Sequence, residues 1–123
     1  MDIYEALYTT RAMRRVRPDP IPEDVQKRIL DAAIRAPSGG NTQPWHFIVL
    51  QDRELRSRFS ELYREAWWAK RKGVGIRGPE DIPADDRVAQ SAMRLADEIG
   101  RAPVIVLVCA TAMGSGPMGA GIP

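Results

Sequence analysis

The sequence predicts an α/β domain in which helices cover an inner sheet. Two apolar runs support this prediction, "FIVL" at residues 47–50 and "VIVLV" at residues 104–108. Both runs are continuously apolar and do not alternate with polar residues, which is typical of strands buried on both faces. The chain around them carries amphipathic helical patterns, and helices of this kind cover such a sheet.

Two helices are predicted before the first strand, separated by an extended segment. The stretch "DIYEALYTT" at residues 2–10 places apolar side chains at helical spacing. Prolines at positions 18, 20 and 22 then exclude helix and hold the chain extended. Pro22 and the two acidic residues after it suit the first turn of a second helix, which runs to about residue 36 and ends at Pro37.

Two further helices are predicted between the strands. Asp52 is placed to cap a helix that ends near residue 67, and a glycine- and proline-rich stretch follows it. The last helix begins near residue 88 and ends at Gly100, shortly before the second strand. The helical stripes expected to face the core comprise Ile3, Ala6, Leu7 and Thr10; Val25, Ile29, Ala32, Ala33 and Ala36; Leu55, Phe59, Leu62, Tyr63 and Ala66; and Val88, Ala92, Leu95, Ala96 and Ile99.

Size and composition indicate one small soluble domain of 123 residues, with 44% apolar and 28% charged residues. The net charge of +2 is too small to indicate a nucleic-acid partner, and no leader or membrane-length apolar run is present. A single cysteine, Cys109, excludes an internal disulfide and favours a reducing, cytoplasmic location. Because two strands alone make a poor sheet, we expect residues 1–123 to form a single incomplete domain with an irregular tail at 111–123.

An arginine cluster, "TTRAMRRVR", lies between the first helix and the prolines. It contains Arg11, Arg14, Arg15 and Arg17. Guanidinium groups bind phosphate oxygens in pairs, so two or three together suit a phosphomonoester. The alternative is a solvated basic face that also favours the negative end of the preceding helix. A nucleic-acid interface is disfavoured because no aromatic residues interleave with the arginines and no recognition helix is evident.

The connection "SGGNTQ", residues 38–43, is the second candidate site. Gly39 and Gly40 let the backbone adopt positive φ or approach a flat ligand closely. Ser38, Asn41 and Gln43 both donate and accept hydrogen bonds, as recognition of a heterocycle requires. The structural alternative is that Gly39 caps the preceding helix while the turn amides bond their own backbone. The residues alone leave both interpretations open.

Other conspicuous features are assigned no chemistry. The stretch "GSGPMG" at 114–119 matches the dinucleotide-binding glycine pattern, but neither a helix nor a downstream acid accompanies it. His46 has no second histidine or cysteine pair with it, so we expect no metal site. Cys109 is interpreted as a small hydrophobic strand residue, and of the adjacent Trp67 and Trp68 only one can face the core. No catalytic acid or base is nominated.

Residues 9–50 together resemble the start of the FMN-dependent nitroreductase family. The arginine-rich element, the "PDPIP" link and the "APSGGNTQPW" stretch match that family's opening elements in order. The helices and the strand "APVIVLVCA" then continue in the expected sequence to about residue 112. The resemblance implies an α+β nitroreductase-like fold, of which this chain is the N-terminal portion.

The resemblance also implies roles for the matching positions. The arginines would hold the FMN phosphate and ribityl chain, and the backbone between them would lie against the ligand. The turn would line the flavin ring, with part of it reaching across a dimer interface. The implied cofactor-binding residues are Arg11, Ala12, Met13, Arg14, Pro37, Ser38, Gly39, Asn41 and Gln43. Similar proteins are homodimers with FMN at the subunit boundary.

Two functional hypotheses follow. The first is an FMN-dependent oxidoreductase that takes hydride from NAD(P)H and passes it through the flavin to a nitroaromatic, quinone or similar small-molecule acceptor. The alternative is a truncated, non-catalytic fragment or interaction module of the same fold, recognisable by exposed apolar surface and no affinity for flavin. Neither hypothesis includes a nucleic-acid or membrane partner.

Overall fold

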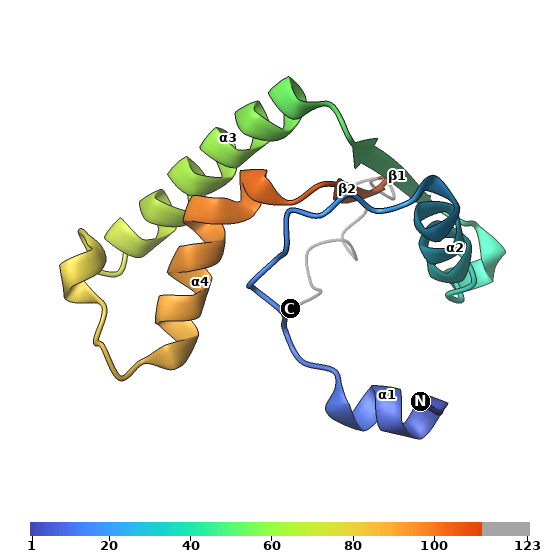
Figure 1. The fold of residues 1–123 in the computed structure, drawn as a ribbon, viewed down its shortest axis with the longest axis horizontal. Coiled ribbons are helices and arrows are strands. Elements are labelled where there is room, and N and C mark those ends of the chain that lie inside the picture. Colours follow the sequence, from blue (N-terminus) through green and yellow to red (C-terminus); the bar gives the residue numbers. More distant parts are fainter. Residues whose placement is uncertain (112–123) are drawn as a thin grey trace.

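The computed structural model describes residues 1–111, in which helices flank a two-stranded antiparallel sheet (Figure 1). The sheet order is β1–β2, and the tail predicted at 111–123 lies outside the described residues except for Thr111. The predicted order of helices and strands is confirmed. The elements are α1 (Ile3–Thr9), α2 (Glu23–Ala33), η1 (Gly39–Asn41), β1 (Trp45–Leu50), α3 (Arg53–Lys72), η2 (Pro79–Asp81), α4 (Arg87–Glu98), η3 (Ile99–Arg101) and β2 (Ile105–Ala110), where η marks a single 3-10 turn.

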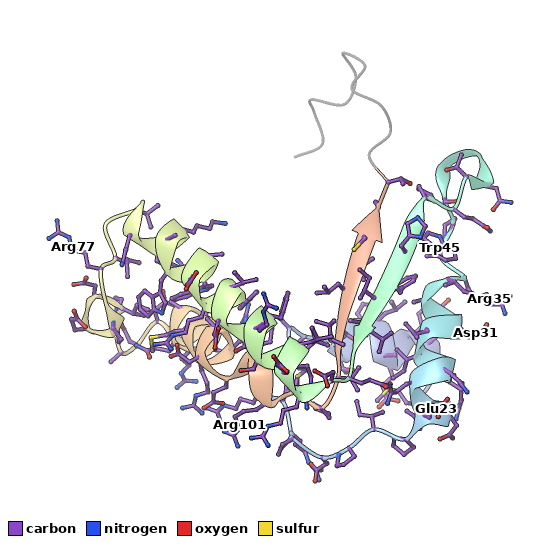
Figure 2. The ribbon with its side chains drawn as sticks, turned by 90° about the horizontal axis from the view of Figure 1, so that it is seen from above. Glu23, Asp31, Arg35, Trp45, Arg77 and Arg101 are labelled. Carbon is purple, nitrogen blue, oxygen red and sulfur yellow. The ribbon has the colours of Figure 1, made fainter. Side chains whose placement is uncertain are left out.

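The sheet is less covered than its sequence predicts. Trp45 pairs with Ala110 and Leu50 with Ile105, so opposed residues share a face and both faces are apolar. Ile105 is buried, but Val108 is 70% exposed and Ile48 is 49% exposed. The expectation that helices of this chain cover both faces is therefore wrong for the described residues. The reason is geometric, because α3 and α4 lie beyond one end of the strands (Figure 2).

Helices α3 and α4 pack against each other and against the η3 turn. At this junction the side chain of Arg56 donates from Nη1 to the carbonyl oxygens of Gly100, at 3.3 Å, and Ala102. Arg64 on α3 also forms an ion pair with Asp97 on α4, at 3.3 Å. The buried apolar residues of the described chain lie on α4 and on the segments that precede and follow it: Ile82, Ala89, Ala96, Ala102 and Ile105.

The helix ends follow local capping chemistry. The Asp52 carboxylate accepts from the backbone N–H of Leu55 at 2.9 Å, as predicted, and Asp86 caps α4 in the same way. The stretch between α3 and α4 is fastened to α4, because Gln90 Nε2 donates to the carbonyl of Ile82 at 3.1 Å. These contacts set where α3 and α4 begin.

Several predicted core stripes are exposed within one chain. Leu7 is 70% exposed on α1, and Leu62 and Val88 are exposed on α3 and α4. The closely packed pairs of elements are β1 with β2 and the α3, α4 and η3 group, and neither α1 nor α2 belongs to them. In Figure 1, α1 projects away from the rest of the chain. The stripe prediction is thus wrong for α1, since no described element lies over it, and also for α2, where Ile29 is 56% exposed and no residue is buried.

Gly100 is required by the close approach of η3 to α3. A Cβ atom built at Gly100 would lie 2.9 Å from Ser60 Cβ. We expect Gly100→Ala to lower the free energy of unfolding by about 1–3 kcal/mol through overpacking, measured by urea denaturation. Gly39→Ala is the matched control, because its added Cβ would meet nothing within 4 Å. Equal losses for the two variants would contradict this account of the junction.

The cap of α3 provides a second test of the fold. Asp52→Ala removes the acceptor for the Leu55 N–H, and we expect it to lower the free energy of unfolding by about 1 kcal/mol. Asp52→Asn keeps an acceptor oxygen and is expected to retain most of the stability. Thermal unfolding followed by circular dichroism measures both. Equal destabilisation by alanine and asparagine would rule out the capping role.

Candidate functional site

The arginine cluster follows α1 in a segment that belongs to no helix or strand. The chain leaves the helix at Thr10, whose backbone is extended, and residues 11–17 have no regular secondary structure. Arg17 forms an ion pair with Asp19 at 2.7 Å. Within residues 1–111, Arg11 and Arg14 take part in no ion pair or side-chain hydrogen bond, and Arg14 is half-buried. Their guanidinium donors are therefore available to an anionic ligand.

The turn at residues 38–43 is closed by hydrogen bonds among its own residues. The Ser38 hydroxyl oxygen accepts from the backbone N–H of Gln43 at 3.1 Å. Thr42 Oγ1 donates to the carbonyl of Gly39 at 3.1 Å, and Gln43 Nε2 donates to Asn41 Oδ1 at 3.2 Å. The turn thus carries a connected set of side-chain hydrogen bonds from Ser38 to Gln43.

This turn contains three residues in the left-handed region. Gly40 has φ of 60°, as the glycine pair predicted, but Asn41 at 54° and Gln43 at 48° adopt it as well. For an L-residue this region costs roughly 1–2 kcal/mol, and asparagine tolerates it better than glutamine does. The alternative that Gly39 caps the preceding helix is wrong, because α2 ends at Ala33 with Ile34 as its cap.

The arginine cluster and the turn do not bond to each other within the described part of the chain. No hydrogen bond or ion pair connects residues 11–17 with residues 37–43 in the part of the chain that the structure describes. The proline segment after the arginines lines a cavity with Gln51 and Arg53, at the end of β1, whereas the turn precedes the start of β1. The described residues thus bring the arginine cluster and the turn into no direct contact by hydrogen bond or ion pair.

A groove that was not predicted lies elsewhere on the described part of the chain. It has a volume of about 700 Å³ and runs between α3, η2 and α4. Trp68 lines it, while Trp67 stacks under the guanidinium of Arg71 with 4.9 Å from its carbon to the ring centroid. Both tryptophans are half-buried, with ring centroids 4.8 Å apart. Two sequence features pointed to this region, the adjacent tryptophans and the glycine- and proline-rich stretch after α3, and residues 77–79 of that stretch line the groove.

The remaining polar candidates gather no metal ligands. His46 lies opposite Cys109 across the strand pair, as a consequence of register. Among residues 1–111, no three histidine, cysteine, aspartate or glutamate side chains come together as a metal site would require. The same residues contain no helix with the length and apolar character needed to span a bilayer.

Comparison with known proteins relates most of the chain to one family. Residues 7–119 match a family model described as the nitroreductase family. A protein of Methanothermobacter thermautotrophicus described as an NADH dehydrogenase/NAD(P)H nitroreductase is 37% identical over 76 residues, 62% of this chain and 40% of the relative. Iodotyrosine deiodinase 1 of Rattus norvegicus is 34% identical over 64 residues, 52% of this chain and 22% of the relative. The chain spans less than half the length of these curated relatives.

A solved structure supports the fold. The FMN-dependent nitroreductase NfnB from Mycobacterium smegmatis, in complex with NADPH, matches with a TM-score of 0.61 at 22% identity. The match covers 91% of this chain and 60% of that chain. The predicted α+β nitroreductase-like fold is therefore confirmed. Because the family model matches nearly the whole chain, from residue 7 to residue 119, this chain belongs to the nitroreductase family.

Proposed function

We propose that this chain serves an FMN-dependent oxidoreductase that takes hydride from NAD(P)H and reduces a nitroaromatic, quinone or similar small-molecule acceptor. The observation that supports it most is the turn at residues 38–43, whose amide side chains are held by hydrogen bonds within the turn. The chain also belongs to the nitroreductase family and carries Arg11 and Arg14, which form no ion pair within residues 1–111. Similarity to iodotyrosine deiodinase adds halogenated aromatics to the acceptors worth testing. A cytoplasmic location is part of the same proposal.

Two observations support the fit of FMN to these residues. Arg11 and Arg14 offer guanidinium forks that match the oxygens of a phosphomonoester, with the backbone of Ala12 and Met13 between them. The turn offers amide and hydroxyl groups for hydrogen bonding. Its backbone is left-handed at Gly40, where the missing side chain lets a flat ring lie close to the main chain. The chemistry FMN supplies when bound is hydride acceptance from NAD(P)H and reduction of the acceptor.

In this proposal the chain's own residues bind the cofactor and fix its orientation. The arginines neutralise the phosphate and fix one end of the ligand, and the turn sets the position of its ring. Water is excluded by Pro37 and the apolar sheet once a second copy lies against them. No side chain is assigned proton transfer, because no described group near the turn or the arginines forms an acid–base pair.

A homodimer is part of the same proposal, with a site that takes the arginine cluster from one copy and the turn from the other. It is supported by the lack of any hydrogen bond or ion pair between these two groups within residues 1–111. The exposed apolar side chains of α1 and the sheet give such an interface its driving force.

The same exposed apolar surface favours a second candidate function, a non-catalytic interaction module of this fold. Val108 on β2 and Leu7 on α1 are each 70% exposed, which is the feature expected of such a module. Affinity for FMN separates the two, since the module requires none.

Flavin binding is the first test of the enzyme. We expect the protein to retain FMN through gel filtration, and the double variant Arg14→Ala, Asn41→Ala to lose it because both the phosphate and the ring contacts are removed. Absorbance of the protein peak in the flavin band is the measurement. Arg28→Ala, on the exposed side of α2, is the control and should retain FMN. Protein that never holds FMN would favour the interaction module.

A subunit-mixing experiment tests whether the site is shared. Arg14→Ala and Asn41→Ala chains are expected to bind FMN poorly alone, whereas a mixture refolded together forms heterodimers with one intact site each. Random pairing restores about a quarter of the wild-type binding capacity, because half of the dimers are mixed and half of their sites are intact. Equilibrium dialysis against FMN measures the capacity. A mixture that binds no better than its components would place both groups in one subunit.

A further inference from the structure

We propose that Ser38 is a positioning residue, which acts through Gln43 to hold the amide of Asn41 in its binding orientation before any ligand arrives. The inference deepens the proposed function and rests on it for the identity of the ligand. It assigns Ser38 an indirect role, in place of the direct flavin contact that the family resemblance implied.

The first step is the unusual backbone at Gln43. Its φ of 48° lies in the left-handed region, and the next residue is Pro44. A residue before proline is normally held in extended conformations by contact with the proline ring. The left-handed conformation of Gln43 is therefore unfavourable for two reasons, its side chain and the proline that follows it. A contact from outside its own backbone must hold it there.

The second step is the contact that holds it. The Ser38 hydroxyl oxygen accepts from the Gln43 N–H at 3.1 Å, from the first residue of the turn to its last. Ser38 is half-buried, whereas Asn41 and Gln43 are exposed, so the serine is the anchored partner. Beyond Pro44 the chain is fixed as well, because Thr111 donates to the Pro44 carbonyl from its backbone nitrogen at 2.8 Å and from Oγ1 at 3.1 Å.

The third step links this brace to the ligand side of the turn. Gln43 Nε2 donates to Asn41 Oδ1 at 3.2 Å, so the two amides are held side by side. Within residues 1–111, Asn41 Nδ2 and Gln43 Oε1 make no hydrogen bond, and both residues are exposed. A ligand can therefore accept from Asn41 Nδ2 and donate to the neighbouring Gln43 Oε1. That pair complements a heterocycle edge carrying an acceptor beside an N–H, as an imide does.

The consequence is a turn that is shaped before binding. Loss of the Ser38 oxygen releases Gln43 toward extended conformations and separates the two amides. A ligand then has to order the turn itself, and its affinity falls although no ligand contact has been deleted. Threonine keeps the hydroxyl oxygen in place and preserves the brace.

The test has two arms on the full chain. In the absence of ligand, a strong NOE between the amide and α protons of the same residue reports positive φ. We expect it at Asn41 and Gln43 in the wild type and in Ser38→Thr, and we expect it to weaken at Gln43 in Ser38→Ala. Ser57→Ala, an exposed serine on α3, is the matched control and should leave both NOEs unchanged.

The second arm is FMN affinity, measured by quenching of flavin fluorescence. Ser38→Ala is expected to bind about three- to tenfold more weakly, the change expected for one lost hydrogen bond, whereas Ser38→Thr and Ser57→Ala bind like the wild type. Weakened binding with unchanged NOEs in Ser38→Ala would show direct ligand contact and overturn the inference. Unchanged NOEs and affinity would also overturn it. If the wild type binds no FMN, the proposed function fails, and the NOE arm alone decides whether Ser38 braces the turn.

Discussion

The close approach of η3 to α3 at Gly100 is the constraint on which the described fold depends. The chain leaves β1, travels out along α3, returns along α4 and must enter β2 beside the strand it left. Arg56 ties this return by donating to the carbonyls of Gly100 and Ala102, just before β2 begins. The pairing of Leu50 with Ile105 follows directly from that junction. A side chain at position 100 would push η3 away from Ser60 and disturb the entry into β2.

The sheet that results is apolar on both faces and only partly covered. Ile105 is buried beside the junction, whereas Val108, nearer the turn at 38–43, is largely exposed. Along β2 exposed and less exposed residues alternate after Ile105, and Val106 is 40% exposed. Exposed apolar side chains of this kind gain free energy when another surface covers them, and the proposed second copy would supply such a surface.

The turn is where local strain and proposed function coincide. Two residues other than glycine adopt positive φ there, and side-chain hydrogen bonds from within the turn hold them. Strained backbone of this kind persists only where its surroundings determine it, and such positions are frequent at binding sites. The arginine cluster contributes differently, since its segment has no regular secondary structure and its side chains act through charge. The amide groups of the turn suit the edge of a ring, and the guanidinium groups of the arginine cluster suit a phosphate. The two groups would therefore bind opposite ends of one ligand.

The sequence by itself determined the order of elements, the cap at Asp52 and the two candidate segments, because prolines, glycines, caps and apolar spacing act over a few residues. It also carried the family resemblance, since that depends on short motifs in order. Only the tertiary structure decided that α1 stands apart, that the strands pair antiparallel with open faces, and that the groove beside Trp68 exists. It also decided that Gln43 is left-handed and bound to Ser38. These features depend on contacts between segments or on a backbone conformation that glutamine before proline disfavours, and local residue preferences do not specify either.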